Sequence, residues 1–192
     1  SIIIPVFNES ESIGYLLDEV KNVMKADELK FELIVVNDGS KDNTSHVLEQ
    51  LSLRIEELMV ISLRKNYGQT AAMAAGFDNS NGEIVITLDG DLQNDPNDIP
   101  KLISHINEGY DLICGWRYNR KDKLINRRIP SKIANKLIAN VTGLKLHDYG
   151  CSLKAFKKEI IDDINLYGEL HRFLPVLANI EGARIKEIKV NH

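Results

Sequence analysis

The chain has 192 residues, of which 43% are hydrophobic and 27% charged, and its formal net charge is −4. This length and composition predict one soluble globular domain with a sizeable core. The negative charge argues against nucleic acid as a partner, and no apolar run approaches the ~18 residues that cross a bilayer. The chain starts without Met and stops directly after a strand-like segment, so we expect a fragment of a longer protein.

Strand and helix patterns alternate from residue 1 to residue 116. Apolar, often β-branched runs predict strands over residues 1–7, 31–36, 58–63, 84–88 and 110–116. Apolar residues at helical spacing predict helices around residues 13–24, 47–51, 70–77 and 99–106. This alternation predicts an α/β fold with a doubly wound, mostly parallel sheet flanked by helices.

The charge pattern changes at residue 116. Residues 116–136, here called the basic segment, contain eight basic residues and one acid, a net +7, so the remaining residues carry −11 to reach −4. Such a run is either a solvated face or a surface for an anionic substrate or an anionic membrane. Beyond it the pattern predicts helices over residues 129–141, 157–166 and 172–181 and a last strand over residues 183–190.

Two acids follow the fourth predicted strand, at Asp89 and Asp91. Carboxylates at the end of a buried strand are costly unless something neutralises them, and Mg²⁺ prefers oxygen ligands of this kind. In an extended chain, residues two apart point the same way, so both acids can face one ion, with Gln93 as a neutral oxygen ligand. Gly90 between them lets a ligand approach the backbone. The alternative is a solvated loop that starts the next helix.

Four short motifs follow one another in the first 116 residues. They are residues 4–9 (Ile-Pro-Val-Phe-Asn-Glu), 35–40 (Val-Val-Asn-Asp-Gly-Ser), 66–68 (Asn-Tyr-Gly) and 88–93 (Leu-Asp-Gly-Asp-Leu-Gln). In these motifs and their order the chain resembles family 2 of the inverting glycosyltransferases, which have the nucleotide-sugar-binding GT-A fold. The resemblance implies a single GT-A catalytic domain over residues 1–192. Residues 1–116 would bind the nucleotide sugar and metal, and residues 117–192 would bind the acceptor.

The closer resemblance is to the polyprenyl-phosphate branch of that family, of the dolichol-phosphate mannose synthase and undecaprenyl-phosphate glucosyltransferase type. It depends on residues 91–96 (Asp-Leu-Gln-Asn-Asp-Pro), 115–117 (Gly-Trp-Arg) and 148–156 (Asp-Tyr-Gly-Cys-Ser-Leu-Lys-Ala-Phe), together with the basic segment. The chain departs at Asn97, where many relatives have proline, and at Leu153-Lys154, where many have Phe-Arg. The resemblance implies membrane helices beyond residue 192 and a location at the cytoplasmic face of a membrane.

The activity that this resemblance implies is metal-dependent transfer of a hexose from a UDP- or GDP-sugar to a polyprenyl phosphate, with Mg²⁺ or Mn²⁺ as cofactor. A phosphate acceptor, whose second pKa is ~6, is already largely ionised and needs positioning more than a base, and arginines can hold it bidentately. The residues expected to act are Asp89, Asp91 and Gln93 on the metal; Pro5, Glu9, Asp38, Gly68 and Asp89 on the nucleotide sugar; Arg117, Arg127 and Arg128 on the acceptor phosphate; and Asp91, Asp148 and Arg117 in catalysis.

Two other functions fit the same residues. A family 2 enzyme acting on a sugar or polysaccharide hydroxyl would need a general base, for which Asp148 is the candidate. A non-catalytic module would bind the sugar nucleotide without transferring the sugar. Two of the assigned acids also have structural alternatives, since Asp38 can cap a turn and Asp148 can pair with a basic residue.

Overall fold

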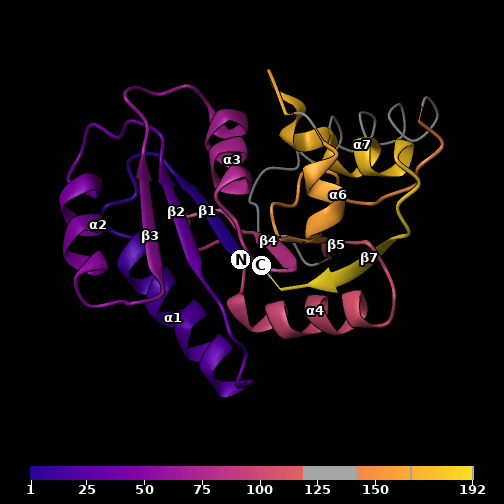
Figure 1. Ribbon diagram of the computed structural model, residues 1–192, viewed down its shortest axis with the longest axis horizontal. Coiled ribbons are helices and arrows are strands. Elements are labelled where there is room, and N and C mark those ends of the chain that lie inside the picture. Colours follow the sequence, from indigo (N-terminus) through magenta and orange to yellow (C-terminus); the bar gives the residue numbers. More distant parts are fainter. Residues whose placement is uncertain (119–141, 165, 192) are drawn as a thin grey trace.

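The computed structural model describes residues 1–118, 142–164 and 166–191. Within these ranges the strands form one seven-stranded sheet (Figure 1). The strand order is β3-β2-β1-β4-β6-β5-β7. All neighbouring strands pair parallel except β6, which is antiparallel to both β4 and β5. The predicted mostly parallel α/β sheet is confirmed. The strands are β1 (Ile2–Val6), β2 (Leu33–Asn37), β3 (Leu58–Ser62), β4 (Ile84–Thr87), β5 (Leu112–Arg117), β6 (Lys154–Lys157) and β7 (Ile185–Val190).

Helices cover both faces of this sheet, as the alternation of strands and helices requires. In β1, Ile2 and Ile4 point into one core and Ile3 points into the other, because successive side chains alternate across a strand. One face is covered by α1 (Ile13–Ala26), α2 (Thr44–Ser52) and α4 (Ile99–Asn107), and the other by α3 (Gln69–Asp78), α6 (Lys158–Asp162) and α7 (Leu174–Ile180) (Figure 1).

The strand β6 was not predicted from the sequence. It has only four residues and begins and ends with lysine, so its side chains show too little alternation to indicate a strand. Its extended backbone depends on the gap between β4 and β5, where Ala155 pairs with both Ile86 and Ile113. Inserting this strand antiparallel brings its first residue to the edge where the parallel strands end.

Two predicted helices differ from the observed ones. The helix expected over residues 157–166 is the shorter α6. The one expected over residues 172–181 begins as a 3₁₀ helix, η2 (Leu170–Phe173), and continues as α7, where Pro175 suits the first turn because it needs no backbone donor there. The helix expected over residues 129–141 lies outside the described residues.

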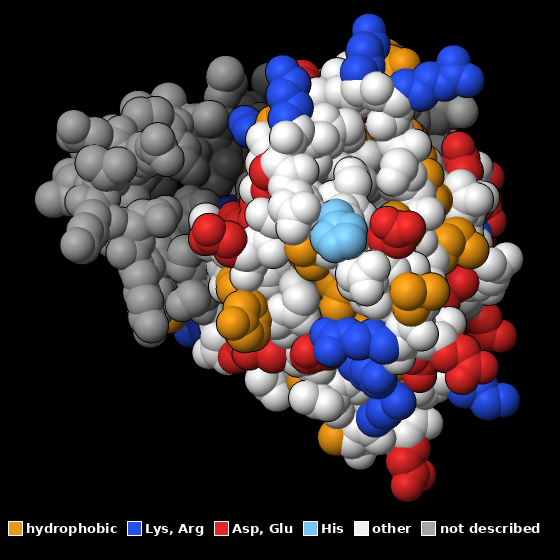
Figure 2. Space-filling view, turned by 90° about the vertical axis from the view of Figure 1, so that its left-hand side faces the viewer, with side chains coloured by type: hydrophobic (Ala, Val, Ile, Leu, Met, Phe, Trp, Pro, Cys, Tyr) orange, Lys and Arg blue, Asp and Glu red, His pale blue; other side chains and the backbone are white. Residues whose placement is uncertain are grey.

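The side of the molecule that carries α2 and β3 has hydrophobic side chains standing singly among charged ones (Figure 2). Scattered exposed apolar residues of this kind are normal on a protein surface. Within the described ranges, no helix has the length and apolar character needed to cross a membrane.

Candidate functional site

The carboxyl ends of the parallel strands meet at one edge of the sheet, and most of the predicted site residues lie there. In open α/β sheets this edge is where ligands bind. Asp38 follows β2, Glu9 follows β1, the pair Asp89 and Asp91 follows β4, and Arg117 ends β5. The tertiary structure therefore brings together residues that are far apart in the chain.

Asp38 organises the loop that leads into α3. Its carboxylate is buried, at 4% exposure, and accepts backbone N–H groups from Tyr67 at 2.7 Å and Gly68 at 2.8 Å, one on each oxygen. Gly68 has a φ of 93°, a conformation that side chains other than glycine rarely adopt. These contacts are the ones expected of an acid that caps a turn, which is the structural alternative for Asp38. A contact with the nucleotide stays a prediction.

The end of β1 packs against the turn after β4. An added Cβ on Gly90 would come 2.7 Å from Val6 Cγ1 and 3.6 Å from the carbonyl oxygen of Pro5. Glycine is therefore needed at position 90 for packing, and our expectation that it gives a ligand access to the backbone stays a prediction. Glu9 accepts a hydrogen bond from Ser12 Oγ at 2.5 Å, which orients its carboxylate along the first turn before α1.

Asp89 is partly buried and held from the neighbouring helix. Gln69, the first residue of α3, donates its side-chain amide to Asp89 Oδ1 at 2.7 Å. Burial raises the pKa of the Asp89 carboxyl; the Ser152 hydroxyl beside it opposes this shift, and the negative charge of Asp91 adds to it. Lys154 and Arg117 lie close enough to favour the ionised form.

Asp91 and Gln93 lie on a turn and not on an extended strand. The strand β4 ends at Thr87, and Leu92 has a φ of 61°. Asp91 is exposed and accepts the backbone N–H of Gln93 at 3.1 Å, while Gln93 lines a hollow of about 800 Å³ together with Tyr118 and Lys189. The extended-chain geometry that we assumed for residues 89–93 is therefore wrong, although Asp91 still lies near Asp89.

The two carboxylates form an incomplete metal site by themselves. Across the described ranges, no three His, Cys, Asp or Glu side chains converge with metal-ligand spacing. The mutual repulsion of Asp89 and Asp91 nevertheless suits a divalent cation, because Mg²⁺ usually takes one or two protein carboxylates and completes its shell with water and substrate phosphates. The residues present fit Mg²⁺ or Mn²⁺ on these terms, and the ligand role of Gln93 stays a prediction.

Arg117 and Asp148 form a bidentate ion pair at the end of β5. Arg117 donates from Nε to Asp148 Oδ2 at 2.8 Å and from a terminal nitrogen to Oδ1 at 3.0 Å. The two side chains are 9% and 7% exposed. Burial works against the charged guanidinium, but the pair with Asp148 outweighs it and raises the pKa of Arg117. The structural alternative for Asp148, pairing with a basic residue, is the one observed.

Several neighbours of this site carried no signal in the sequence. Ser152 donates to Asn94 Oδ1 at 2.7 Å, which ties the segment before β6 to the turn after β4. His171 lies 2.7 Å from the hydroxyl of Thr70, a residue 101 positions earlier, and burial lowers the pKa of its imidazole. Such contacts between distant segments leave no local pattern.

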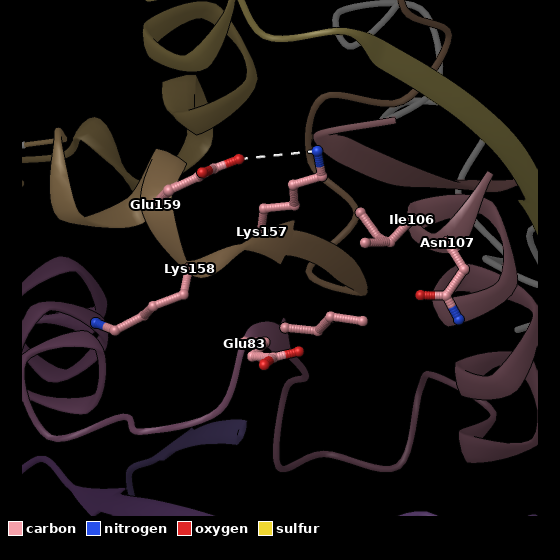
Figure 3. A pocket seen from close by; sticks show the side chains of 7 residues that line it. Glu83, Ile106, Asn107, Lys157, Lys158 and Glu159 are labelled. Atoms are coloured by element: carbon pink, nitrogen blue, oxygen red, sulfur yellow. Dashed lines mark ion pairs between the residues drawn. The ribbon is translucent and has the colours of Figure 1, made fainter. Parts of the chain in front are cut away.

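A second hollow lies at the opposite edge of the sheet, around the start of β4 and the end of β6 (Figure 3). It measures about 430 Å³ and is lined by Glu83, Lys157, Lys158 and Glu159, among others. Its cations are already paired, Lys157 with Asp111 at 2.7 Å and Lys158 with Asp162 at 2.7 Å. This hollow therefore offers little net charge to a phosphate. The predicted phosphate ligands Arg127 and Arg128 lie outside the described residues.

Comparison with known proteins gives one family and several relatives. The family model described as "Glycosyl transferase family 2" matches residues 1–164. A dodecaprenyl-phosphate galacturonate synthase of Rhizobium johnstonii is 46% identical over 196 residues, with 100% of this chain and 58% of the relative covered. An undecaprenyl-phosphate 4-deoxy-4-formamido-L-arabinose transferase of Proteus mirabilis is 42% identical over 193 residues, with 100% of this chain and 59% of the relative covered. The chain thus spans under two thirds of either relative.

Solved structures of the same architecture include glucosyl-3-phosphoglycerate synthase from Mycobacterium tuberculosis in complex with Mn²⁺ and UDP-glucose. The two folds superimpose with a TM-score of 0.76 at 18% identity, over 99% of this chain and 68% of that one. This likeness confirms the predicted GT-A fold.

Proposed function

This chain belongs to glycosyltransferase family 2, and on that basis we propose that the protein carrying it is an inverting glycosyltransferase that moves a sugar from a UDP- or GDP-sugar to a polyprenyl phosphate. The printed names of the two curated relatives share a polyprenyl phosphate and differ in the sugar. The lipid acceptor is therefore the better supported half of the proposal, and the relatives leave the sugar open.

One observation of the site carries the proposal. The guanidinium of Arg117 lies within electrostatic range of Asp89, so the cation that ends β5 lies at the same edge of the sheet as the carboxylate that follows β4, with β6 between the two strands. A phosphate acceptor held by Arg117 would then approach a donor whose diphosphate lies over Asp89 and Asp91. Arginine suits this task because its planar guanidinium matches the geometry of a phosphate.

The reaction needs little proton transfer under this proposal. An oxygen of the ionised acceptor phosphate bonds to the anomeric carbon of the sugar, and the bond from that carbon to the diphosphate oxygen breaks, which releases the nucleoside diphosphate. A divalent cation, when bound, supplies positive charge to the leaving diphosphate. Gln69 keeps Asp89 in place through its 2.7 Å hydrogen bond, and Asp148 keeps Arg117 oriented through the bidentate pair.

The alternative with a hydroxyl acceptor is less well supported. A general base must be within hydrogen-bond reach of the proton that it removes. Both oxygens of Asp148 accept hydrogen bonds from Arg117, at 2.8 Å and 3.0 Å, and the side chain is 7% exposed. Asp148 would have to leave this pair in order to act as the base.

The membrane surface is the second partner in the proposal. Each basic residue near an anionic surface contributes on the order of 1 kcal/mol, so the +7 of the basic segment favours salt-sensitive docking at the cytoplasmic face. Leu124 and Ile125, which lie between basic residues, suit the boundary between headgroups and acyl chains. Membrane helices outside this chain would anchor the full-length protein.

The test separates the three candidate functions by their products. The full-length protein is incubated with Mg²⁺, labelled UDP- and GDP-sugars, and either polyprenyl phosphate or oligosaccharides. Labelled polyprenyl-phosphate sugar supports the proposal. Labelled oligosaccharide favours the hydroxyl acceptor, and binding of the sugar nucleotide without either product favours the non-catalytic module.

A paired measurement tests the role of the basic segment. Arg127→Ala/Arg128→Ala should raise the KM for polyprenyl phosphate about tenfold while nucleotide affinity stays unchanged, and Arg54→Ala, in an exposed ion pair beside α2, should change neither. The wild-type protein should bind anionic vesicles at low salt and release them at high salt. If the double variant loses nucleotide binding and the wild-type protein binds no vesicles at any salt concentration, the basic segment binds the donor diphosphate instead of the lipid.

A further inference from the structure

His171 forms a hydrogen bond through one of its two ring nitrogens. The residue lies in η2, and its side chain is 10% exposed. Its Nδ1 is 2.7 Å from the hydroxyl oxygen of Thr70, the second residue of α3. Among the residues that the structure describes, none forms a hydrogen bond with the other nitrogen, Nε2. Burying a polar group is costly unless it is hydrogen-bonded, so Nε2 is available to a ligand.

The hydroxyl of Thr70 determines which nitrogen of His171 carries the proton. Burial, with the positive charges of Arg172 and Lys154, lowers the pKa of His171, so the ring is neutral at neutral pH. Glu169 opposes this shift, but its carboxylate is 84% exposed and lies 4.0 Å from Nδ1, beyond hydrogen-bond distance. If Thr70 donates to Nδ1, only the N–H of Nε2 lacks a partner within the described residues. If Nδ1 donated instead, the hydroxyl proton and Nε2 would both lack one, so we assign the proton to Nε2.

The surroundings of this N–H favour an anion. Thr70 lies in the first turn of α3, a helix of ten residues, where backbone N–H groups and the helix dipole attract negative charge. The ammonium of Lys154 is within electrostatic range of His171, and so is the carboxylate of Asp89. A phosphate satisfies all of these groups, because a divalent cation on Asp89 would neutralise the repulsion between the two anions.

Two phosphate groups take part in the proposed reaction, and the position of His171 favours that of the donor. Gln69, the residue before Thr70, holds Asp89 through a 2.7 Å hydrogen bond, so the start of α3 lies beside the proposed metal ligand. Arg117, the proposed ligand of the acceptor phosphate, ends β5, which is two strands beyond β4. The helix α3 packs on β1 and β2, on the opposite side of β4 from β5.

We propose that Nε2 of His171 donates a hydrogen bond to a phosphate oxygen of the donor's diphosphate. This inference rests on the proposed function, because it assumes a nucleotide-diphosphate-sugar donor. His171 is then a catalytic residue, and Thr70 is a positioning residue that fixes the orientation of the ring and the place of its proton. Negative charge increases on the diphosphate as its bond to the anomeric carbon breaks, so a donor aimed at it stabilises the transition state more than the ground state.

The experiment compares nucleotides that differ by one phosphate, by calorimetry on the full-length protein with Mg²⁺ and without lipid. The ligands are UMP with UDP and GMP with GDP. His171→Phe keeps a ring but removes the donor, so it should weaken binding of the nucleoside diphosphate about tenfold. Its affinity for the monophosphate should stay unchanged, which also shows that the variant is folded. In the transfer assay its kcat should fall at least about a hundredfold.

Three further variants separate the contact from a structural role. His171→Gln keeps an N–H donor on a side chain of similar reach and should retain part of the diphosphate affinity and of kcat. Thr70→Val removes the hydroxyl at constant shape and should lower both, but it should cost nothing further when His171 is already Phe, because Thr70 acts through the ring. His46→Phe, at a 63% exposed side chain in α2, should change neither quantity.

Other results would overturn the inference. Equal weakening of monophosphate and diphosphate binding in His171→Phe would give the residue a structural role. Weaker binding of the nucleotide sugar with unchanged diphosphate affinity would place the contact on the sugar. A change confined to the KM for polyprenyl phosphate would place it on the acceptor phosphate.

Failure of the proposed function gives a different result. If His171→Phe loses diphosphate affinity selectively but no sugar reaches polyprenyl phosphate in the wild type, the assigned acceptor is wrong and the inference about His171 stands. If sugar reaches polyprenyl phosphate and His171→Phe matches the wild type in kcat and diphosphate affinity, the assigned acceptor stands and the inference is wrong.

Discussion

Removal of the Asp148 carboxylate should destabilise the protein by about 3 kcal/mol. Breaking a buried ion pair by deleting one partner costs about 3–5 kcal/mol, because it leaves the other charge buried and unpaired. The Arg117 and Asp148 side chains are 9% and 7% exposed rather than fully enclosed, which favours the lower end of that range. For a protein of this size, about 3 kcal/mol corresponds to a fall in Tm of about 6–12 °C.

Urea unfolding of Asp148→Ala, Arg117→Met and the double variant Arg117→Met/Asp148→Leu measures this effect. Each single variant should lower the free energy of unfolding by about 3 kcal/mol. The double variant should cost less than the sum of the two, because apolar side chains of similar volume replace a buried pair at little or no cost. Asp18→Ala is the matched control, since its pair with Arg54 is exposed, at 54% and 59%, and such pairs contribute under about 1 kcal/mol.

The result that refutes this reasoning is specific. If Asp148→Ala costs no more than Asp18→Ala, the bidentate pair does not determine stability. Strict additivity in the double variant would show that Arg117 and Asp148 act independently. In either case Asp148 becomes available again as a general base, and a loss of kcat in Asp148→Asn without loss of stability would favour the hydroxyl acceptor.

Four other predictions concern the donor side of the site. Asp91→Asn should lower kcat at least about a hundredfold with the fold intact, because it removes charge at constant shape; full activity of this variant, or activity in EDTA, would contradict the metal assignment. Asp38→Ala should weaken UDP or GDP binding about tenfold by calorimetry, because residues 67 and 68 lose their shared acceptor; an unchanged Kd leaves Asp38 a purely structural role. Gly90→Ala should lower the free energy of unfolding by about 1–3 kcal/mol, since its Cβ would meet Val6 at 2.7 Å; an unchanged urea midpoint would contradict the packing role. Burial raises the pKa of Asp89, so the native state binds a proton more readily than the unfolded state. In EDTA, urea unfolding should therefore show stability rising as pH falls from the raised pKa toward the ordinary value; the rise should vanish in Asp89→Asn, and its persistence would assign the effect elsewhere.

Local patterns in the sequence predicted most of the fold. The buried runs that become β1, β2, β4 and β5 are apolar on both faces, as strands covered by helices must be. The helices α1 and α4 repeat their apolar residues at helical spacing, and Asp95 caps the turn before α4 by accepting the backbone N–H of Asn97. These features depend on residues that are close together in the sequence, so the sequence alone is enough to predict them.

The same local logic located the acids of the site but not their partners. Asp38, Asp89 and Asp91 were recognisable because each follows a buried strand. That Asp38 binds two backbone N–H groups near residue 67, and that Asp148 pairs with Arg117, depended on which loops the sheet places side by side. The sequence alone left these roles as alternatives.

Only the tertiary structure decided where Lys154 lies. The short segment around it carries weak strand signals, and it becomes β6 because it fills the gap between β4 and β5 with its own hydrogen bonds. Inserted antiparallel, it starts at the edge where the other strands end, and this buries its first ammonium beside Asp89. Periodicity in the sequence indicates which residues are buried. Which distant residues come into contact is determined by the order and direction of the strands, and these depend on the whole chain.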